Sequence, residues 1–326
     1  MDSTQLTDHV RAAFGTACHL ESLDRLAGGA RKQIYRARLR DPSLGVLVYL
    51  WHNEAGYFAD RERAGFEDTQ TDEQAPLLFD ATVRFLANHR VSVPEVLHRG
   101  RLDSGHQVAF VEEIVGEPWT AFAPTASPSE RAQAREALGA EVGRLHSIHR
   151  SWPGIPDPVV EAAALSPERV AERTRWELMT LAGANLEIAV NRERVEVRLQ
   201  ELVEAIKPRP QFTLVHGELP HHLLVRHADR RLFLVDVEGV QFADVEIDHI
   251  QCRLFLAPED YEAVARDDLD PDRMSFYGLC WHISAAYAGS RLVAGGFPDQ
   301  VLARQIYEHN VRRSLELCLQ GPTARS

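Results

Sequence analysis

The sequence lacks the features of a membrane protein and of a secreted protein held together by disulfides. Its four cysteines, Cys18, Cys252, Cys280 and Cys318, are far apart and form no CxxC pair, so we interpret them as reduced thiols. The first residues contain no basic segment followed by an apolar one, which argues against a signal peptide. No apolar run approaches the roughly 20 residues that span a bilayer. We therefore expect a cytoplasmic protein with no membrane contact.

Positive charge is also scarce relative to negative charge. The chain has 36 lysines and arginines against 48 aspartates and glutamates, a formal net charge of −12. The phosphates of nucleic acid would be repelled, so nucleic acid is not an expected partner. A cationic substrate would be attracted, although such an imbalance also serves solubility alone. The 326 residues are 44% hydrophobic and 26% charged, which is ordinary for a globular protein of two domains or lobes.

The spacing of apolar residues divides the chain into a β-rich first part and a helical second part. Before residue 115, helical spacing at 4–17 and 76–90 accompanies strand-like alternation at 30–39, 45–51, 95–101 and 107–114. Beyond it, the segment from Ser127 to Glu130 is a capping box with proline at the first helical position, and it opens a helix to about His149. Further helices are expected at 166–182, 187–207, 246–256, 258–266, 272–293 and 298–319. We predict an α+β fold with domains at 1–115 and 116–326.

Residues 214–250 place acids and histidines at the ends of apolar runs. His216 and Glu218 follow one run, and Asp236 and Glu238 follow the run at 232–235, after a hairpin-like pair of strands. The ends of paired strands lie close together, so these residues predict a site for Mg²⁺, which prefers oxygen ligands, and for a hydroxyl nucleophile. Asp236 is the leading metal ligand, and Glu238 points to the same side if the chain stays extended.

The remaining residues of this region suggest distinct roles. Glu218 is the candidate catalytic base, because a carboxyl group with a pKa of about 4.3 is ionised at neutral pH and can accept a hydroxyl proton. His216 is more typical of a structural residue that fixes the backbone through a nearby acid such as Asp248, although direct acid–base work is the alternative. His221 and His222 either supply a nitrogen ligand, which suits Zn²⁺ or Mn²⁺ better than Mg²⁺, or form a solvent-facing pair.

These motifs resemble those of the aminoglycoside phosphotransferase and choline kinase family, which has a bilobal protein-kinase-like fold. The family's H-G-D-L-x-x-x-N, I-D-W-E and G-D-P-x-x-D segments are similar to residues 216–219, 235–238 and 243–248. The resemblance implies ATP or GTP as co-substrate and Mg²⁺, or alternatively Mn²⁺, as cofactor. It also likens residues 108–116 to the strand and hinge that contact adenine, which makes Glu112 a candidate nucleotide contact.

The sequence departs from this family in its catalytic loop and its third strand. Glu218 stands where the family has aspartate, and a carboxylate displaced by about an ångström costs about 10²-fold in rate unless the loop compensates. The family's asparagine is missing and the loop is one residue shorter, which leaves His221 or His222 to take its place. The third strand, at 45–51, contains no lysine.

A replacement for the missing lysine is expected next to Gly28 and Gly29. These glycines form either a phosphate-binding loop or an ordinary turn. Lys32 is the only lysine of the first 115 residues and would reach the phosphates from the neighbouring strand, with Arg31 as the second candidate. Asp80, early in the following helix, is the expected acidic partner of Lys32.

The sequence thus predicts an enzyme that transfers a phosphoryl group to a hydroxyl of a small molecule, such as an aminoglycoside-like antibiotic, another natural product or a metabolite. A second hypothesis is a kinase for Ser or Thr of a precursor peptide in natural-product biosynthesis, with a partner lyase that eliminates the phosphate. A third is a pseudokinase that binds without catalysis. The acidic segment at 259–272 would favour an amine-bearing acceptor if its carboxylates are free; a solvated charged turn is the alternative.

Overall fold

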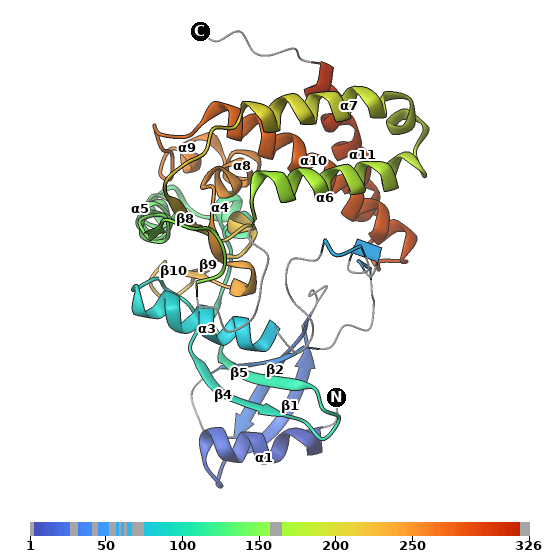
Figure 1. Ribbon diagram of the computed structural model, residues 1–326. Helices are drawn as coiled ribbons and strands as arrows, with labels where there is room; N and C mark the ends of the chain where they lie inside the picture. Colours follow the sequence, from blue (N-terminus) through green and yellow to red (C-terminus); the bar gives the residue numbers. More distant parts are fainter. Residues whose placement is uncertain are drawn as a thin grey trace.

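The structure is a computed structural model that describes residues 3–26, 32–40, 45–51, 57–58, 60–61, 64–66, 75–156 and 165–319. A β-sheet lies at one end of the molecule and a group of helices at the other, with helix α3 (Ala75–Asn88) between them (Figure 1). None of the helices in the described ranges combines the length and apolar character needed to cross a membrane. The predicted α+β class is confirmed.

The first part is a five-stranded antiparallel sheet with the order β1-β2-β3-β5-β4. Helix α1 (Ser3–Phe14) packs on β1 and β4, and α3 contacts β5. Most residues of β3 and β5 are buried, because both faces of these strands are covered, whereas β1 lies at an edge and is largely exposed. The strands are β1 (His19–Arg25), β2 (Gln33–Arg40), β3 (Val46–Leu50), β4 (Val96–Arg101) and β5 (Gln107–Glu112).

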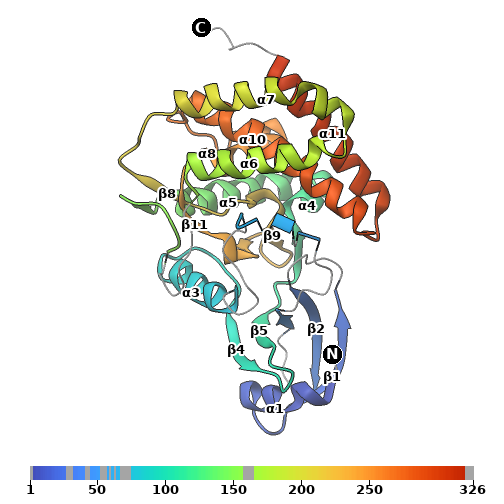
Figure 2. The ribbon, with the colours of Figure 1, turned by 45° about the vertical axis from the view of Figure 1, so that its right-hand side comes forward.

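The second part is mainly helical, and its long helices gather away from the sheet (Figure 2). Helix α10 is central to it, because it packs against α6, α7, α8 and α11. The predicted capping box is confirmed: the Ser127 hydroxyl accepts a hydrogen bond from the Glu130 amide, and the Glu130 carboxylate accepts one from the Ser127 amide. The helices are α4 (Trp119–Thr125), α5 (Pro128–His146), α6 (Pro167–Ala182), α7 (Leu186–Ala205), α8 (Glu246–Phe255), α9 (Pro258–Tyr261), α10 (Pro271–Ala294) and α11 (Gln300–Leu319).

Two small sheets carry the loops that follow residues 215 and 234. One has the order β10-β9-β6 and the other β11-β8-β7, and the antiparallel β9–β10 pair is the predicted hairpin. Two short 3₁₀ helices, η1 (Leu219–His221) and η2 (Val237–Gly239), follow β8 and β10. The strands are β6 (Gly116–Pro118), β7 (His149–Arg150), β8 (Phe212–Val215), β9 (Leu223–Arg226), β10 (Leu232–Leu234) and β11 (Gln241–Ala243).

A shared apolar core fixes the hairpin against the first part of the molecule. Leu219, Leu223 and Leu234 are fully buried, and they belong to the same cluster as Phe79 of α3 and Trp119 of α4. Closely packed interiors leave side chains little room to shift. The polar residues that follow these leucines are therefore held in defined positions.

Several elements differ from the expectations. The helix predicted at 258–266 is only the single turn α9, and α5 ends at His146 rather than His149, because residues 149–150 pair with β8 as β7. Strand β1 and the short elements β6, β7, β11 and α4 were not predicted. The domain boundary between residues 115 and 116 stays a prediction; β6, just after it, pairs with β9.

Candidate functional site

A buried carboxylate, Asp248, holds the loop that follows β8. Its two oxygens accept hydrogen bonds from the backbone amides of His216 (2.9 Å) and Gly217 (2.7 Å), and His146 Nε2 donates to it at 3.0 Å. Burial raises the pKa of Asp248, but the hydrogen bond and the charge of His146 lower it by more than burial raises it. The pKa of Asp248 is therefore below its usual value. Gly217 has a φ of +90°, a conformation in which a side chain is strained. These contacts and the conformation of Gly217 fix the shape of the loop.

The ring of His216 braces this loop against the hairpin. Its Nε2–H donates to the carbonyl of Val235 (2.9 Å), and its Nδ1 accepts from the amide of Glu218 (3.3 Å). Burial and the neighbouring His222 lower the pKa of His216, which favours the neutral ring that these two bonds require. The contacts fit the structural role expected for His216, but the expected partner was wrong: Asp248 binds the backbone of His216, and its ring binds Val235.

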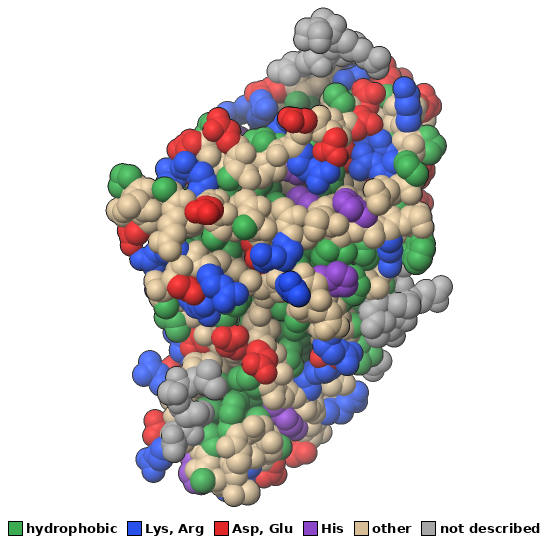
Figure 3. Space-filling model, turned by 90° about the vertical axis from the view of Figure 1, so that its left-hand side faces the viewer, with side chains coloured by type: hydrophobic (Ala, Val, Ile, Leu, Met, Phe, Trp, Pro, Cys, Tyr) green, Lys and Arg blue, Asp and Glu red, His purple; other side chains and the backbone are tan. Residues whose placement is uncertain are grey.

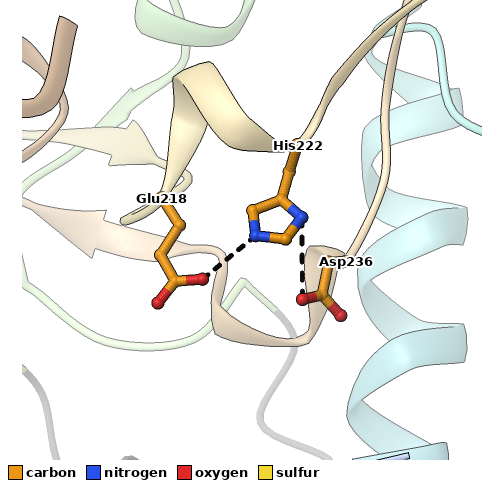
Figure 4. A group of neighbouring side chains, drawn as sticks. All are labelled: Glu218, His222 and Asp236. Atoms are coloured by element: carbon orange, nitrogen blue, oxygen red, sulfur yellow. Dashed lines mark hydrogen bonds and ion pairs between the residues drawn. The ribbon is translucent and has the colours of Figure 1, made fainter. Parts of the chain in front are cut away.

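Glu218, His222 and Asp236 point toward one another (Figure 4). His222 Nε2 lies 3.1 Å from Glu218 Oε2, and His222 Nδ1 lies 3.7 Å from Asp236 Oδ2. One ligand atom from each of the three residues lies within 4.8 Å of the other two. The ring of His222 also stacks on that of His216, with centroids 5.6 Å apart and an angle of 12° between the planes. The arrangement can bind a metal ion.

The charges of this group shift the pKa values of two of its members in opposite directions. Burial lowers the pKa of His222, but the hydrogen bond to Glu218 and the charge of Asp236 outweigh burial and raise it. Burial raises the pKa of Asp236, but the positive charges of Lys32 and His222 outweigh burial and hold it well below its usual value. Asp236 is thus ionised at neutral pH.

Lys32, one of only two lysines in the chain, binds both acids that follow β10. Its Nζ donates to Asp236 Oδ1 at 2.6 Å and to Glu238 Oε1 at 2.5 Å. Burial lowers the pKa of Lys32, but the two carboxylates raise it more, so the ammonium stays charged. Lys32 and these two acids therefore meet although they are more than 200 positions apart, a contact that the sequence did not predict.

The register of the first sheet explains how Lys32 reaches this place. Gln33 lies opposite Leu50 and Ile34 opposite Tyr49, so Lys32 precedes β2 at the level where β3 ends. Its Nζ lies 4.7 Å from the ring centroid of Tyr49, within the range of a cation–π contact. Lys32 thus occupies the end of the sheet at which the third-strand lysine was expected.

The backbone at Asp236 does not continue as an extended strand. Its φ of 59° and ψ of 47° are left-handed, a conformation that aspartate adopts more readily than most residues. The chain then turns into η2, so the expectation of an extended Asp236–Glu238 segment was wrong. Glu238 nevertheless reaches Lys32. Burial raises the pKa of Glu238 although Lys32 opposes this, and its Oε2 is buried without a hydrogen-bond partner in the described structure.

Two of the predicted site residues lie elsewhere. Asp80 binds Arg84 (2.9 Å) and Arg99, whereas Lys32 binds Asp236 and Glu238. His221 was a candidate ligand beside His222, but its ring packs edge-on against Phe255 with centroids 4.3 Å apart and is not part of the group of possible ligands among the described residues.

The remaining nucleotide contacts stay predictions. Glu112 ends β5, and its carboxylate accepts a hydrogen bond from the amide of Glu95 at 3.2 Å. Gly28, Gly29 and Arg31 lie outside the described residues. The predictions also missed Tyr49, whose ring lies beside Lys32. Its only signal was its position on the strand that lacks the expected lysine.

The acidic segment at 259–272 is largely neutralised by arginines. Asp260 is buried and bonds to Arg131 (2.7 Å) and to a second arginine, and Asp268 bonds to Arg266. Asp270 accepts hydrogen bonds from two amides at the start of α10. On the face shown in Figure 3, acidic and basic side chains are interspersed. Neither a free acidic rim nor a simply solvated turn describes this segment.

Comparison with known proteins identifies a family and a fold. A model of the phosphotransferase enzyme family matches residues 47–277. No curated protein sequence matches the chain. Among solved structures, spectinomycin phosphotransferase in complex with ADP and spectinomycin has a TM-score of 0.65 at 13% identity, and 98% of each chain is covered.

Other solved structures are similar to the same extent. The GDP complex of a mutant aminoglycoside 2'-phosphotransferase has a TM-score of 0.62 at 15% identity, with 97% of each chain covered. A thermostable aminoglycoside phosphotransferase in a ternary complex with AMP-PNP and hygromycin B has a TM-score of 0.59 at 14% identity, with 94% of this chain and 98% of that chain covered. These likenesses confirm the expected kinase-like fold.

Proposed function

The chain belongs to the phosphotransferase enzyme family, and on this premise we propose that it transfers the γ-phosphoryl group of ATP or GTP to a hydroxyl of a small molecule. The observation that carries the proposal is the convergence of Lys32 on Asp236 beside Glu218 and His222. Phosphoryl transfer requires a cationic group for the phosphates, acidic metal ligands and a carboxylate that orients the nucleophile. Each of these groups is present here.

Lys32 would bind the nucleotide phosphates. An ammonium group has three N–H donors, and two of them bind Asp236 and Glu238. The third donor remains for a phosphate oxygen, and the carboxylates hold the Nζ in place while it binds. The GDP, ADP and AMP-PNP named for the similar structures support a nucleotide as co-substrate.

Asp236 would hold the divalent cation, with Mg²⁺ or Mn²⁺ as the expected ion. Its Oδ1 binds Lys32, while its Oδ2 faces His222. The donor set fits such an ion, because it offers carboxylate oxygens and because Glu238 Oε2 is buried without a partner in the described part of the chain. When bound, the cation would neutralise charge on the β- and γ-phosphate oxygens.

Glu218 would orient the acceptor hydroxyl and accept its proton. Its side chain is 69% exposed, so an acceptor can approach it, while the bond to His222 limits its movement. Asp248 and His216 hold the backbone of the loop that carries Glu218 through hydrogen bonds. The backbone of this loop is held at residues 216, 217 and 218, so the longer side chain of Glu218 would reach the acceptor from a fixed backbone position.

The acceptor would be an aminoglycoside-like antibiotic, another natural product or a metabolite. The similar structures include complexes with spectinomycin, hygromycin B and kanamycin. In this chain the carboxylates of Asp260 and Asp268 are already paired with arginines. We therefore do not assign these acids to the binding of a polycationic acceptor, and we place the acceptor beside Glu218.

Titration calorimetry with AMP-PNP and GMP-PNP tests the nucleotide site. In the presence of a divalent cation, the wild type should bind at least one of the two, and Asp236→Ala and Lys32→Ala should bind it more weakly. Absence of binding to the wild type would refute the proposal. Binding of nucleotide without transfer to any hydroxyl acceptor would instead favour the pseudokinase hypothesis, and unchanged binding by Lys32→Ala would remove Lys32 from the site.

A further inference from the structure

We propose that Glu218, His222 and Asp236 form one metal site that prefers Mn²⁺ to Mg²⁺, with His222 as the ligand that sets the preference. The proposal rests on the proposed function of the same site, which requires a divalent cation. It goes beyond that function because it names the ion and the residue responsible for selecting it.

The three side chains converge on one another. Figure 4 shows the carboxylates of Glu218 and Asp236 on either side of the His222 ring, and one ligand atom of each residue lies within 4.8 Å of the others. The stack on His216 holds one face of the His222 ring. The ring therefore has little freedom to turn away from the two carboxylates, and one of its nitrogens would bind the cation.

Exposure of the three side chains leaves a way in for a cation and its waters. The side chain of His222 is 24% exposed, that of Asp236 is 42% exposed and that of Glu218 is 69% exposed. The site is therefore closed by protein on the His222 side and open on the Glu218 side. A cation bound here can keep further positions for water or for phosphate oxygens.

The charge balance of the site also calls for a dication. Lys32 supplies one ammonium group to Asp236 and Glu238, whereas Glu218 contacts His222, so the carboxylates of this region outnumber the lysine that binds them. The buried Oε2 of Glu238 finds no hydrogen-bond donor among the described residues. Buried charge without compensation is costly, and one divalent cation would remove the excess.

The imidazole ligand distinguishes Mn²⁺ from Mg²⁺. Mg²⁺ demands oxygen ligands in near-ideal octahedral geometry and gives up its waters reluctantly. Mn²⁺ accepts carboxylate oxygens. It is also the first member of the series of divalent metals whose affinity for a given nitrogen and oxygen site rises toward Cu²⁺. A site of two carboxylates and one imidazole thus fits Mn²⁺ better than an ion that is restricted to oxygen.

Pulsed electron paramagnetic resonance of Mn²⁺ tests this site directly. Protein without an affinity tag, labelled with ¹⁵N in histidine only, is loaded with Mn²⁺, with and without AMP-PNP. We expect a ¹⁵N coupling from imidazole in the wild type. The coupling should be absent in His222→Asn and kept in His221→Asn, the matched control whose ring packs on Phe255.

Titrations with Mn²⁺ and Mg²⁺ measure the preference itself. The wild type should bind Mn²⁺ more tightly than Mg²⁺. His222→Asn should lose about 10–100-fold in Mn²⁺ affinity, the loss seen even for outer partners of metal ligands, and lose much less for Mg²⁺. Circular dichroism verifies that each variant is folded. Should His222→Asn fail to fold, the wild-type and His221→Asn spectra decide: the ¹⁵N coupling must be present in both.

Each other outcome overturns the proposal. These are no Mn²⁺ binding with or without nucleotide, Mn²⁺ binding without a histidine coupling, a coupling that His221→Asn removes, or equal affinity for the two ions. Failure of this proposal is distinguishable from failure of the proposed function. Phosphoryl transfer supported equally by both ions would agree with the proposed function and refute the metal preference. A His222 coupling without phosphoryl transfer would agree with the metal site and refute the proposed function.

Discussion

At the scale of single residues, Lys32 connects the two parts of the molecule. It is buried beside Asp236 and Glu238 just before the first residue of β2, and its ammonium is the only one that the described structure brings to these acids. Removing one member of such a group leaves the other charges buried without a partner. The stability lost in this way exceeds the stability that the intact group contributes. The lysine therefore matters for stability as well as for the nucleotide.

Replacement of this lysine should affect both properties. We expect Lys32→Met to lower the free energy of unfolding by about 1–3 kcal/mol, because Glu238 loses its counter-charge. Nucleotide affinity should fall by about 10–100-fold, the equivalent of one charge-assisted hydrogen bond. Lys207→Met, at the other, exposed lysine, is the control and should change neither. Urea unfolding and calorimetry measure the two effects, and equal behaviour of both variants would contradict the account.

Asp248 predicts a dependence of stability on pH. Its pKa is lowered in the folded protein, so its contribution is fully present above its usual pKa of about 3.9 and is lost as the pH falls through the lower, folded value. We expect Asp248→Asn to be less stable than the wild type by about 2–4 kcal/mol at pH 7. The difference should shrink below about pH 4. A difference that is the same at pH 7 and pH 3 in denaturant titrations would refute this.

At the scale of elements, the small sheets depend on close approach of their backbones. A Cβ atom on Gly116 would lie 2.2 Å from the carbonyl oxygen of Val225, so only glycine allows β6 to pair with β9. This pairing connects the segment that follows the first sheet with the β9–β10 hairpin, which precedes Asp236. The hairpin is thus anchored through a contact between backbones.

Substitution of glycines tests this anchor with an internal control. We expect Gly116→Ala to destabilise the protein by about 1–3 kcal/mol, the usual cost of forcing an atom into a packed region. Gly143→Ala should be neutral or stabilising by up to about 1 kcal/mol, because alanine is the better helix former and nothing lies within 4 Å of the added Cβ in α5. Thermal unfolding compares the two. Equal loss of stability in both variants would show that the β6–β9 contact is not limiting.

Sequence patterns predicted the elements whose signals are local. Helices α5, α6 and α10 carry caps and apolar spacing within their own residues, and the β9–β10 hairpin has two apolar runs. Strand β1 was not predicted because it lies at an edge and is mostly exposed. Strands of two or three residues, such as β7 and β11, exist only through pairing with β8. Nothing in their own sequence favours a strand.

The site, like the fold, was predictable where its signals lie in one stretch of the sequence. The residues at 216–218, 222, 236 and 238 stand in one recognisable stretch, whereas the choice of partner for Lys32 depends on tertiary packing. Asp80 was the nearer acid in sequence, yet Asp236 and Glu238, 204 and 206 residues away, bind the lysine. Similarly, only the fold decides that His222 and not His221 turns toward Glu218.

At the scale of the whole molecule, the arrangement joins one cation from the sheet to acids from the helical part. Lys32 directly precedes β2, an inner strand of the first sheet, and Asp236 and Glu238 follow a hairpin packed on α3 and α4. Any change in the relative position of the two parts would therefore alter the contacts of Lys32. The phosphates would bind where the two parts meet.

The central claim is that this meeting point transfers a phosphoryl group, and ³¹P nuclear magnetic resonance tests it most directly. With ATP or GTP and Mn²⁺ or Mg²⁺ present, water can take the place of the acceptor hydroxyl. We predict that the wild type slowly converts the γ-phosphate of at least one nucleotide to orthophosphate. Asp236→Asn should release no more than a sample without protein. Release at the same rate by Asp236→Asn and wild type, or none from the wild type with either nucleotide and either ion, would contradict the account.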